Sequence, residues 1–213
     1  MIKQPLAGVV FDLDNTLVSS SLNFTQIKAA VGCPLEVDVL SFIDQLPQKQ
    51  QCLAKQVVND YEMADAHHAT KLAGADKVLA LLSRLNIPYA IVTRNNKVAG
   101  SLKLKNNNLN VDLLLTREDF KAKPAPDALL YLAQHWSIPA NQILCVGDFL
   151  YDIQMANNAQ TQSCLVSYGQ TLEYANLATF VVDDLNALSD IIEQTHKPIN
   201  ITIKDTLTHH EQS

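Results

Sequence analysis

The chain has 213 residues, of which 47% are hydrophobic and 18% charged, and its formal net charge is −6. This length and apolar content suit one domain, or one domain with a modest insertion, that buries a substantial core. The acidic balance and the absence of a dense Lys/Arg cluster argue against nucleic-acid partners and anionic membrane surfaces, since both require basic patches. No apolar run approaches the roughly 18 residues of a membrane helix, so no membrane partner is expected.

The N-terminus and the cysteines predict a cytoplasmic protein. The first five residues lead directly into an apolar run, which leaves no room for a signal peptide. The four cysteines form no C-x-x-C pair, and we expect reduced thiols in the core or on the surface. They are Cys33, Cys52, Cys145 and Cys164.

The first predicted element is a buried strand over residues 9–11, which is followed at once by Asp12 and Asp14. In an open parallel sheet, ligands collect at the carboxyl ends of the strands, so acids just past a strand face a cleft. Either acid alone is explained equally well as a helix cap or a turn residue. The two together, echoed by acids after a later strand, indicate a functional site.

Residues 19–73 contain helix-leaning sequence, with Pro34 and Pro47 as interruptions and no obvious strand. We predict an all-helical insertion here. His67 and His68 lie near its end, and adjacent histidines point in different directions on a helix. We therefore expect them at the surface, with a metal or substrate site as the alternative.

From Gly74 onward, predicted strands alternate with predicted helices, which indicates parallel βαβ units with right-handed crossovers. The predicted fold class is α/β: a Rossmann-like parallel sheet with helices on both faces and a small all-helical unit inserted after the first strand. The predicted helices are 76–85, 97–105, 127–136 and 153–158, and the predicted strands are 89–95, 111–115, 143–146, 164–167 and 179–182.

The predicted domains are an α/β core of residues 1–18 and 74–195, the helical insertion of residues 19–73, and a polar tail of residues 196–213. In the tail, Ile199 and Ile201 alternate with polar residues, a pattern compatible with a short edge strand.

Further polar groups follow the later strands. Thr93 belongs to the strand predicted at 89–95, and Asp148 and Asp152 follow the strand predicted at 143–146. Between them, Lys123 precedes two prolines and a predicted helix start, which fix where the cation points. Lys121 is the competing cation, and we prefer Lys123 for this reason.

In chain order these motifs are Asp-x-Asp, Thr, Lys and Gly-Asp-x-x-x-Asp. In this order the sequence resembles the haloacid dehalogenase superfamily over roughly residues 7–193, in its phosphatase branch, which includes phosphoglycolate-phosphatase-like enzymes. Each motif alone is weak, but the four together are strong. The resemblance implies that residues 19–73 form a cap that closes over the cleft, excludes water and contacts the substrate.

The resemblance also implies roles for the catalytic residues. Asp12 is the nucleophile that forms an aspartyl-phosphate, and Asp14 protonates the leaving alcohol and then activates water. Thr93 hydrogen-bonds a phosphate oxygen, helped by backbone N–H groups of Arg94 and the next residue if a helix begins there. Lys123 neutralises charge on the nucleophile and the phosphate. The alternative for Thr93 is an ordinary hydroxyl at a strand end, and Arg94 is left out of the catalytic set.

A phosphate dianion beside carboxylates requires a cation, and Mg²⁺ fits because it prefers oxygen ligands. The resemblance places Asp12, the backbone carbonyl of Asp14, and Asp148 around Mg²⁺, with Asp152 orienting a bound water or another ligand. Asp152 as a favourable charge at a helix N-terminus is the alternative.

The predicted function is therefore that of a Mg²⁺-dependent phosphatase acting on a small phosphorylated metabolite. Asp14 argues against a dehalogenase, which has no leaving alcohol to protonate. Asn15 stands where the family commonly has Gly, and Asn also enters the left-handed conformation without large cost. The rivals are a phosphomutase of the same superfamily and a catalytically silent binding or regulatory protein.

Overall fold

The computed structural model describes residue 2 and residues 6–196, and the possible edge strand at Ile199 and Ile201 lies outside them. The core is a six-stranded parallel sheet in the order β3-β2-β1-β4-β5-β6. The strands are β1 (Gly8–Phe11), β2 (Tyr89–Val92), β3 (Leu114–Leu115), β4 (Ile143–Gly147), β5 (Gln162–Val166) and β6 (Phe180–Val182).

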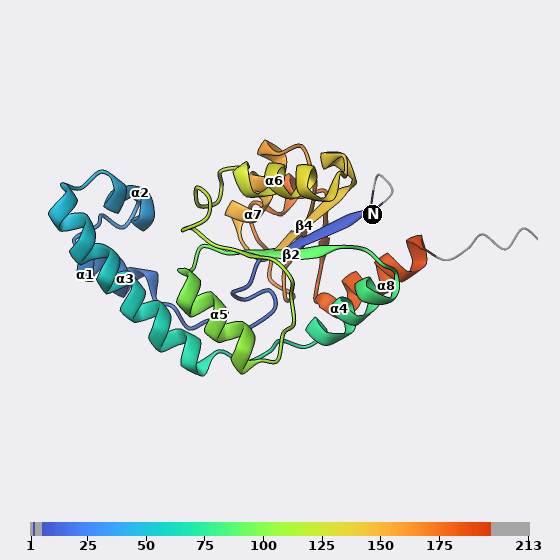
Figure 1. Cartoon of the computed structure of the whole chain (residues 1–213), viewed down its shortest axis with the longest axis horizontal. Helices are drawn as coiled ribbons and strands as arrows, with labels where there is room; N and C mark the ends of the chain where they lie inside the picture. Colours follow the sequence, from blue (N-terminus) through green and yellow to red (C-terminus); the bar gives the residue numbers. More distant parts are fainter. Residues whose placement is uncertain (1, 3–5, 197–213) are drawn as a thin grey trace, which may run out of the picture.

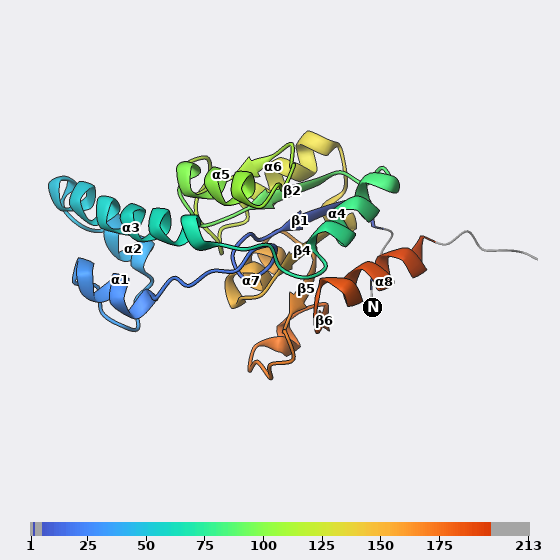
Figure 2. The same cartoon turned by 90° about the horizontal axis from the view of Figure 1, so that it is seen from below.

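Helices cover both faces of the sheet (Figures 1 and 2). One face carries α4 (Ala75–Arg84), α5 (Lys97–Asn106) and α8 (Leu185–Thr195), and the other carries α6 (Asp127–Trp136) and α7 (Leu150–Asn158). Successive strand residues point to opposite faces. In β1, Val9 and Phe11 therefore pack into one hydrophobic cluster, while Val10 packs into the other. The predicted fold class is confirmed.

Several element boundaries differ from the sequence prediction. β2 ends at Val92, and β3 is limited to Leu114–Leu115, where it pairs only with β2 at the sheet edge. Helix α7 begins at Leu150 because the side chain of Asp152 accepts a hydrogen bond from the Phe149 backbone N–H at 3.2 Å, in a capping arrangement. Helix α8 was not predicted, and it begins where Asp184 accepts a hydrogen bond from Ala187 N.

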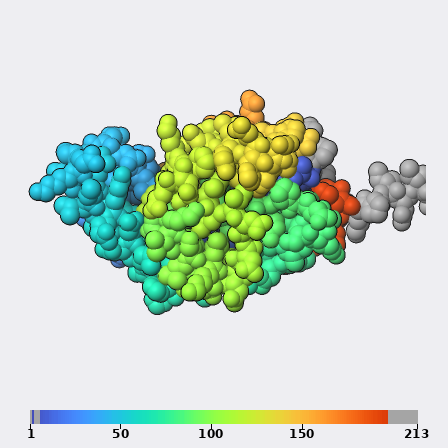
Figure 3. All heavy atoms as spheres, viewed as in Figure 1, coloured from blue at the N-terminus to red at the C-terminus, as the bar shows by residue number. Residues whose placement is uncertain are grey.

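Residues 19–73, all of which the structure describes, contain three helices and no strand. These are α1 (Phe24–Val31), α2 (Val39–Asp44) and α3 (Gln48–His68). They enclose a small hydrophobic cluster of their own around Ile27, Ile43 and Val58. Figure 3 shows them as a separate lobe beside the core, coloured blue to cyan. The division into a core and a cap domain remains a prediction.

The structure also shows where the two adjacent histidines and the four cysteines lie. His67 and His68 are exposed, as expected. The four cysteines are free thiols, of which only Cys52 is exposed. Within the described ranges, no helix combines the length and apolarity that crossing a membrane requires. The cytoplasmic location remains a prediction.

The strand order places a crevice at the carboxyl ends of β1 and β4. The chain runs from β1 outward through β2 and β3, and then returns to β4 on the other side of β1. Ligands of open α/β sheets bind at such a reversal of strand order. Phe11 pairs with Val146, and the Asp12 backbone N–H donates to the Val146 carbonyl at 2.8 Å. The residues that follow β1 and β4 therefore lie side by side.

Candidate active site

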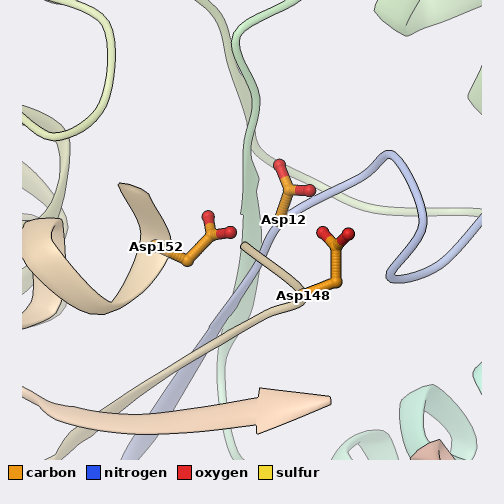
Figure 4. Close-up of side chains that lie close together, drawn as sticks. All are labelled: Asp12, Asp148 and Asp152. Carbon is orange, nitrogen blue, oxygen red and sulfur yellow. The ribbon is translucent and has the colours of Figure 1, made fainter. Parts of the chain in front are cut away.

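Three carboxylates meet at this crevice. One carboxylate oxygen from each of Asp12, Asp148 and Asp152 lies within 4.8 Å of the others. Asp12 follows β1, Asp148 follows β4 and Asp152 is in the first turn of α7, and Figure 4 shows the three side chains converging. Asp12 and Asp152 are buried, at 8% and 4% exposure.

Gly147 makes the approach of Asp152 possible. A Cβ atom at Gly147 would lie 2.2 Å from Cγ of Asp152, far inside any real contact distance. The Phe149 backbone N–H donates to Asp152 Oδ2 at 3.2 Å and so holds the carboxylate in this position. The glycine in the Gly-Asp-x-x-x-Asp motif is thus required by packing against its last acid.

Lys123 is the cation that reaches the carboxylates. Its Nζ atom contacts Asp12 Oδ1 and lies 2.7 Å from Asp152 Oδ1, and its side chain is only 3% exposed. Helix α6 begins at Asp127 with Pro126 as its N-cap, as predicted. Lys121, the competing candidate, is exposed. The choice of Lys123 therefore agrees with the geometry.

Thr93 lies directly after β2, where its backbone N–H donates to Leu115 O at 2.9 Å. Its hydroxyl oxygen accepts hydrogen bonds from the Asn95 side-chain amide at 2.8 Å and the Asn95 backbone N–H at 3.2 Å. Helix α5 begins at Lys97, as predicted, after the N-cap Asn96. The condition for help from the backbone N–H groups of Arg94 and Asn95, a helix that begins at these residues, is therefore not met.

Asp14 is separate from the carboxylate cluster and has partners of its own. Its Oδ2 accepts from the Asn95 side-chain amide at 2.7 Å, and its Oδ1 lies 2.5 Å from Lys103 Nζ. The next residue, Asn15, has φ +54°, the left-handed conformation expected there, and its N–H donates to Val18 O at 2.7 Å. The turn after Asp14 is therefore intact with Asn in place of Gly.

Burial and like charge shape the electrostatics. Burial, with Asp12 and Asp152 nearby, raises the pKa of Asp148 to about 8. Burial also raises the pKa of Asp12 to about 6, against the opposing effect of Lys123. Burial alone would lower the pKa of Lys123, but the two acids that it contacts raise it above its usual range. Lys123 thus pairs with two of the three carboxylates, and its single positive charge does not balance the cluster.

A cavity of about 290 Å³ opens beside these groups and is shared by the core and the helical insertion. All six predicted site residues line it: Asp12, Asp14, Thr93, Lys123, Asp148 and Asp152. The insertion contributes Phe24, Lys28, Asp38 and Val39 to its wall. The site therefore has one charged, core-built end and one end built by α1, α2 and the residues between them.

Arg94, left out of the predicted catalytic set as a solvated or substrate-adjacent side chain, also lines this cavity. Its guanidinium lies 2.5 Å from Asp38 Oδ2 and donates to the Lys123 carbonyl at 2.5 Å. It also stacks over the Tyr151 ring, 4.5 Å from the ring centre. Arg94 thus links the insertion, the Lys123 segment and α7 at the cavity.

The partners of Asp14 also went unrecognised in the sequence. Lys103 is buried on α5, on the same helix face as Ala99 and Gly100, where an apolar residue is the normal occupant. Asp65 is likewise buried on α3 and pairs with Lys103 at 2.7 Å. A charged residue within a buried helical stripe was the available signal.

Residues 9–166 match the family model described as haloacid dehalogenase-like hydrolase. The chain belongs to this family. It is 28% identical over 209 residues to a haloacid dehalogenase-like hydrolase domain-containing protein of Arabidopsis thaliana, covering 90% of this chain and 85% of that protein.

Two further comparisons agree with the family assignment. A phosphoglycolate phosphatase of Vibrio vulnificus is 25% identical over 224 residues, covering 90% of this chain and 98% of the relative. The crystal structure of a hydrolase from Pseudomonas syringae superposes with a TM-score of 0.75 at 21% identity, covering 88% of this chain and 98% of that one. This structural likeness supports the fold.

Gly147→Ala is expected to destabilise the protein by about 1–3 kcal/mol, because the new methyl group must displace Asp152 from Lys123. Thermal or urea unfolding measures this change. Gly100→Ala is the matched control, since a Cβ there meets its nearest atom at 3.4 Å, an ordinary contact. Equal stability of the two variants would contradict the packing role of Gly147.

Proposed function

We propose that this family member is a Mg²⁺-dependent phosphatase that hydrolyses a small phosphorylated metabolite through an aspartyl-phosphate on Asp12. The main support is the position of Asp12, which faces the cavity and contacts Lys123 within a cluster of three carboxylates. A relative named as a phosphoglycolate phosphatase supports the phosphatase branch. The cavity of about 290 Å³ favours a small leaving group.

The donor set fits Mg²⁺. Hard carboxylate oxygens are the ligands that this ion prefers, and it keeps several waters beside one or two protein carboxylates. Asp12 and Asp148 would hold the ion together with the backbone carbonyl of Asp14. Asp152, which lies on α7, would orient a bound water or another ligand of the ion. When bound, Mg²⁺ supplies positive charge that offsets the carboxylates and polarises the phosphoryl group. Burial, together with the negative charge of Asp12 and Asp152, raises the pKa of Asp148, and a divalent cation would relieve this charge.

The chain's own groups account for both proton transfers. The Asp12 carboxylate attacks phosphorus while the ester P–O bond breaks, and the leaving oxygen keeps the electron pair and takes the proton of Asp14. The Asp14 carboxylate then accepts a proton from a water that attacks the same phosphorus. Phosphate departs and the Asp12 carboxylate is restored. Thr93 would bind a phosphate oxygen, and Lys123 would neutralise the nucleophile and the transferring group.

Asp12→Asn is expected to lower hydrolysis by roughly three or more orders of magnitude while the fold remains intact, because an amide is a poor nucleophile of nearly the same shape. Release of inorganic phosphate from an aryl phosphate and from a metabolite panel measures this. The matched control is Asp127→Asn, at an exposed acid on α6. A rate above a few per cent of the wild-type rate, in protein free of contaminating phosphatase, would refute the assignment of Asp12.

Mg²⁺ binding is expected to tighten as the pH rises toward about 8. In the metal-free protein Asp148 keeps its proton up to about pH 8, whereas the unfolded chain releases it near pH 4. The proton therefore stabilises the metal-free fold at low pH, and this contribution is lost as the pH rises through about 8. Because Mg²⁺ requires the carboxylate, its binding displaces this proton near neutral pH.

Calorimetry in buffers of different ionisation enthalpy tests this coupling by counting the protons released. The rise in melting temperature caused by Mg²⁺ should increase between about pH 7 and about pH 9. Asp148→Asn has no proton to release and should bind weakly without this dependence. Affinity that stays constant across this range would contradict the assignment of Asp148.

Side chains of the insertion are expected to set substrate preference. Lys28→Ala should lower turnover of the preferred metabolite by a larger factor than turnover of an aryl phosphate, whose good leaving group needs little remote binding energy. Steady-state kinetics on both substrates measure this, with exposed Lys49→Ala on α3 as the control. Equal losses on both substrates would show that this wall does not select the substrate.

The metabolite panel also separates the rival functions. A phosphomutase would convert a hexose-1-phosphate into its isomer with little free phosphate, whereas a phosphatase releases free phosphate. A protein that hydrolyses no phosphate ester would be a binding or regulatory member of the family.

A further inference from the structure

Lys103 is a buried cation outside the carboxylate cluster of Asp12, Asp148 and Asp152. It lies on α5 with no exposed surface. Its Nζ atom is 2.5 Å from Asp14 Oδ1 and 2.7 Å from Asp65 Oδ2. A lysine is almost never fully buried unless it is paired, and here it is paired with an acid from the core and an acid from the helical insertion.

Asp65 connects Lys103 to the segment that leads into the insertion. The Asp65 carboxylate accepts hydrogen bonds from the Ser20 hydroxyl at 2.9 Å, the Ser21 hydroxyl at 2.9 Å and the Ser21 backbone N–H at 2.6 Å. Ser20 and Ser21 lie in the outgoing connection, and Asp65 lies near the end of α3, just before the return connection. The Asp65 carboxylate therefore joins the outgoing and the return connections between the core and the insertion.

Asp14 is fixed and yet open to the cavity. Lys103 holds one of its oxygens and the Asn95 amide holds the other, while 21% of its side chain remains exposed and it lines the cavity. Asn95 also accepts from Lys103 at 3.4 Å through its side-chain oxygen, so the three groups form one hydrogen-bonded unit. The rotamer of Asp14 thus depends on Lys103.

Stability is a poor explanation for this arrangement. Removing a lysine and two carboxylates from water carries a desolvation penalty, and hydrophobic residues of similar volume often stabilise a protein as well or better. What an ion pair of this kind provides is a defined orientation of its members. The member facing the cavity is Asp14.

We propose that Lys103 is a positioning residue that aligns Asp14 with the leaving oxygen and couples this alignment, through Asp65, to the position of the helical insertion. The inference rests on the proposed phosphatase function, in which Asp14 gives its proton to the leaving oxygen as the P–O bond breaks. Lys103 itself touches neither the phosphate nor the leaving group in this scheme.

Two aryl phosphates of similar size test the proposal, because they differ mainly in the need for a proton donor. Phenyl phosphate has a poor leaving group that requires protonation, and 4-nitrophenyl phosphate has a good one that does not. Lys103→Met should lower kcat on phenyl phosphate by about tenfold more than kcat on 4-nitrophenyl phosphate, since misaligned acid catalysis affects only the former strongly. KM should change little on either substrate.

Glu62→Gln is the matched control. Glu62 is a buried acid on the same helix α3, three residues before Asp65, and it pairs with Arg117 at 2.5 Å instead of Lys103. Its other oxygen accepts from the Asn96 backbone N–H at 2.9 Å and side-chain amide at 2.7 Å, so it also ties the insertion to the start of α5. This variant loosens the insertion without touching Asp14, so any loss should be the same on both aryl phosphates. Asp65→Asn should resemble Lys103→Met, and the two effects should be non-additive because Asp65 acts through Lys103.

Equal losses on both aryl phosphates in a folded Lys103→Met protein would overturn the proposal and leave Lys103 with a structural role only. If this variant does not fold, the neutral pair Lys103→Gln with Asp65→Asn takes its place and is judged by the same ratio. The proposed function fails separately, since it requires that the wild-type protein hydrolyse 4-nitrophenyl phosphate. If the wild-type protein is active and the variants lose kcat equally on both aryl phosphates, only the proposed role of Lys103 is contradicted.

Discussion

The arrangement of this site depends on holding three carboxylates within 4.8 Å of one another against their mutual repulsion. Lys123 is buried, and it offsets part of the negative charge by contacting Asp12 and Asp152. Among the described residues Asp148 makes no ion pair, and burial beside Asp12 and Asp152 raises the pKa of its carboxyl to about 8. The repulsion is therefore relieved by a proton on Asp148, which a divalent cation could replace.

The parallel sheet makes this cluster possible because it brings strand ends together that are far apart in sequence. The reversal of strand order puts β1 beside β4, so Asp12 and Asp148 become neighbours across more than half the chain. Gly147 then lets α7 start close enough for Asp152 to join them. Fold and site are thus specified by the same feature, an acid placed directly after a buried strand at the switch point.

Because the site residues directly follow the strands in sequence, much of the fold and of the site could be predicted from the sequence. The sheet, its two layers of helices and the residues at the strand ends follow from apolar runs with polar residues directly after them. The start of α5 at Lys97 agrees with the prediction. The turn before it could not be read in this way, because Asn95 suits either a turn or a cap, and its hydrogen bonds to Thr93 are what make the turn.

The partners of Asp14 were hidden for a different reason. Asp14 and Lys103 are 89 positions apart, one just after β1 and the other on α5, so no pattern within either segment links them. Their pairing depends on tertiary contacts, which a single sequence does not report.

The protein has two buried lysines among its described residues, Lys103 and Lys123, and each bridges two aspartates. Lys123 joins two acids of the core, so its geometry is set by the rigid sheet and α7. Lys103 joins a core acid to an acid of the insertion, so its geometry follows the position of α3. A charge-neutralising group benefits from a fixed place, because preorganised charge stabilises the transition state without reorganisation. A proton donor for the leaving group benefits instead from contact with the part of the protein that surrounds that group. Under the proposed function, the different partners of the two lysines match a division of the cavity into a phosphoryl end and a leaving-group end.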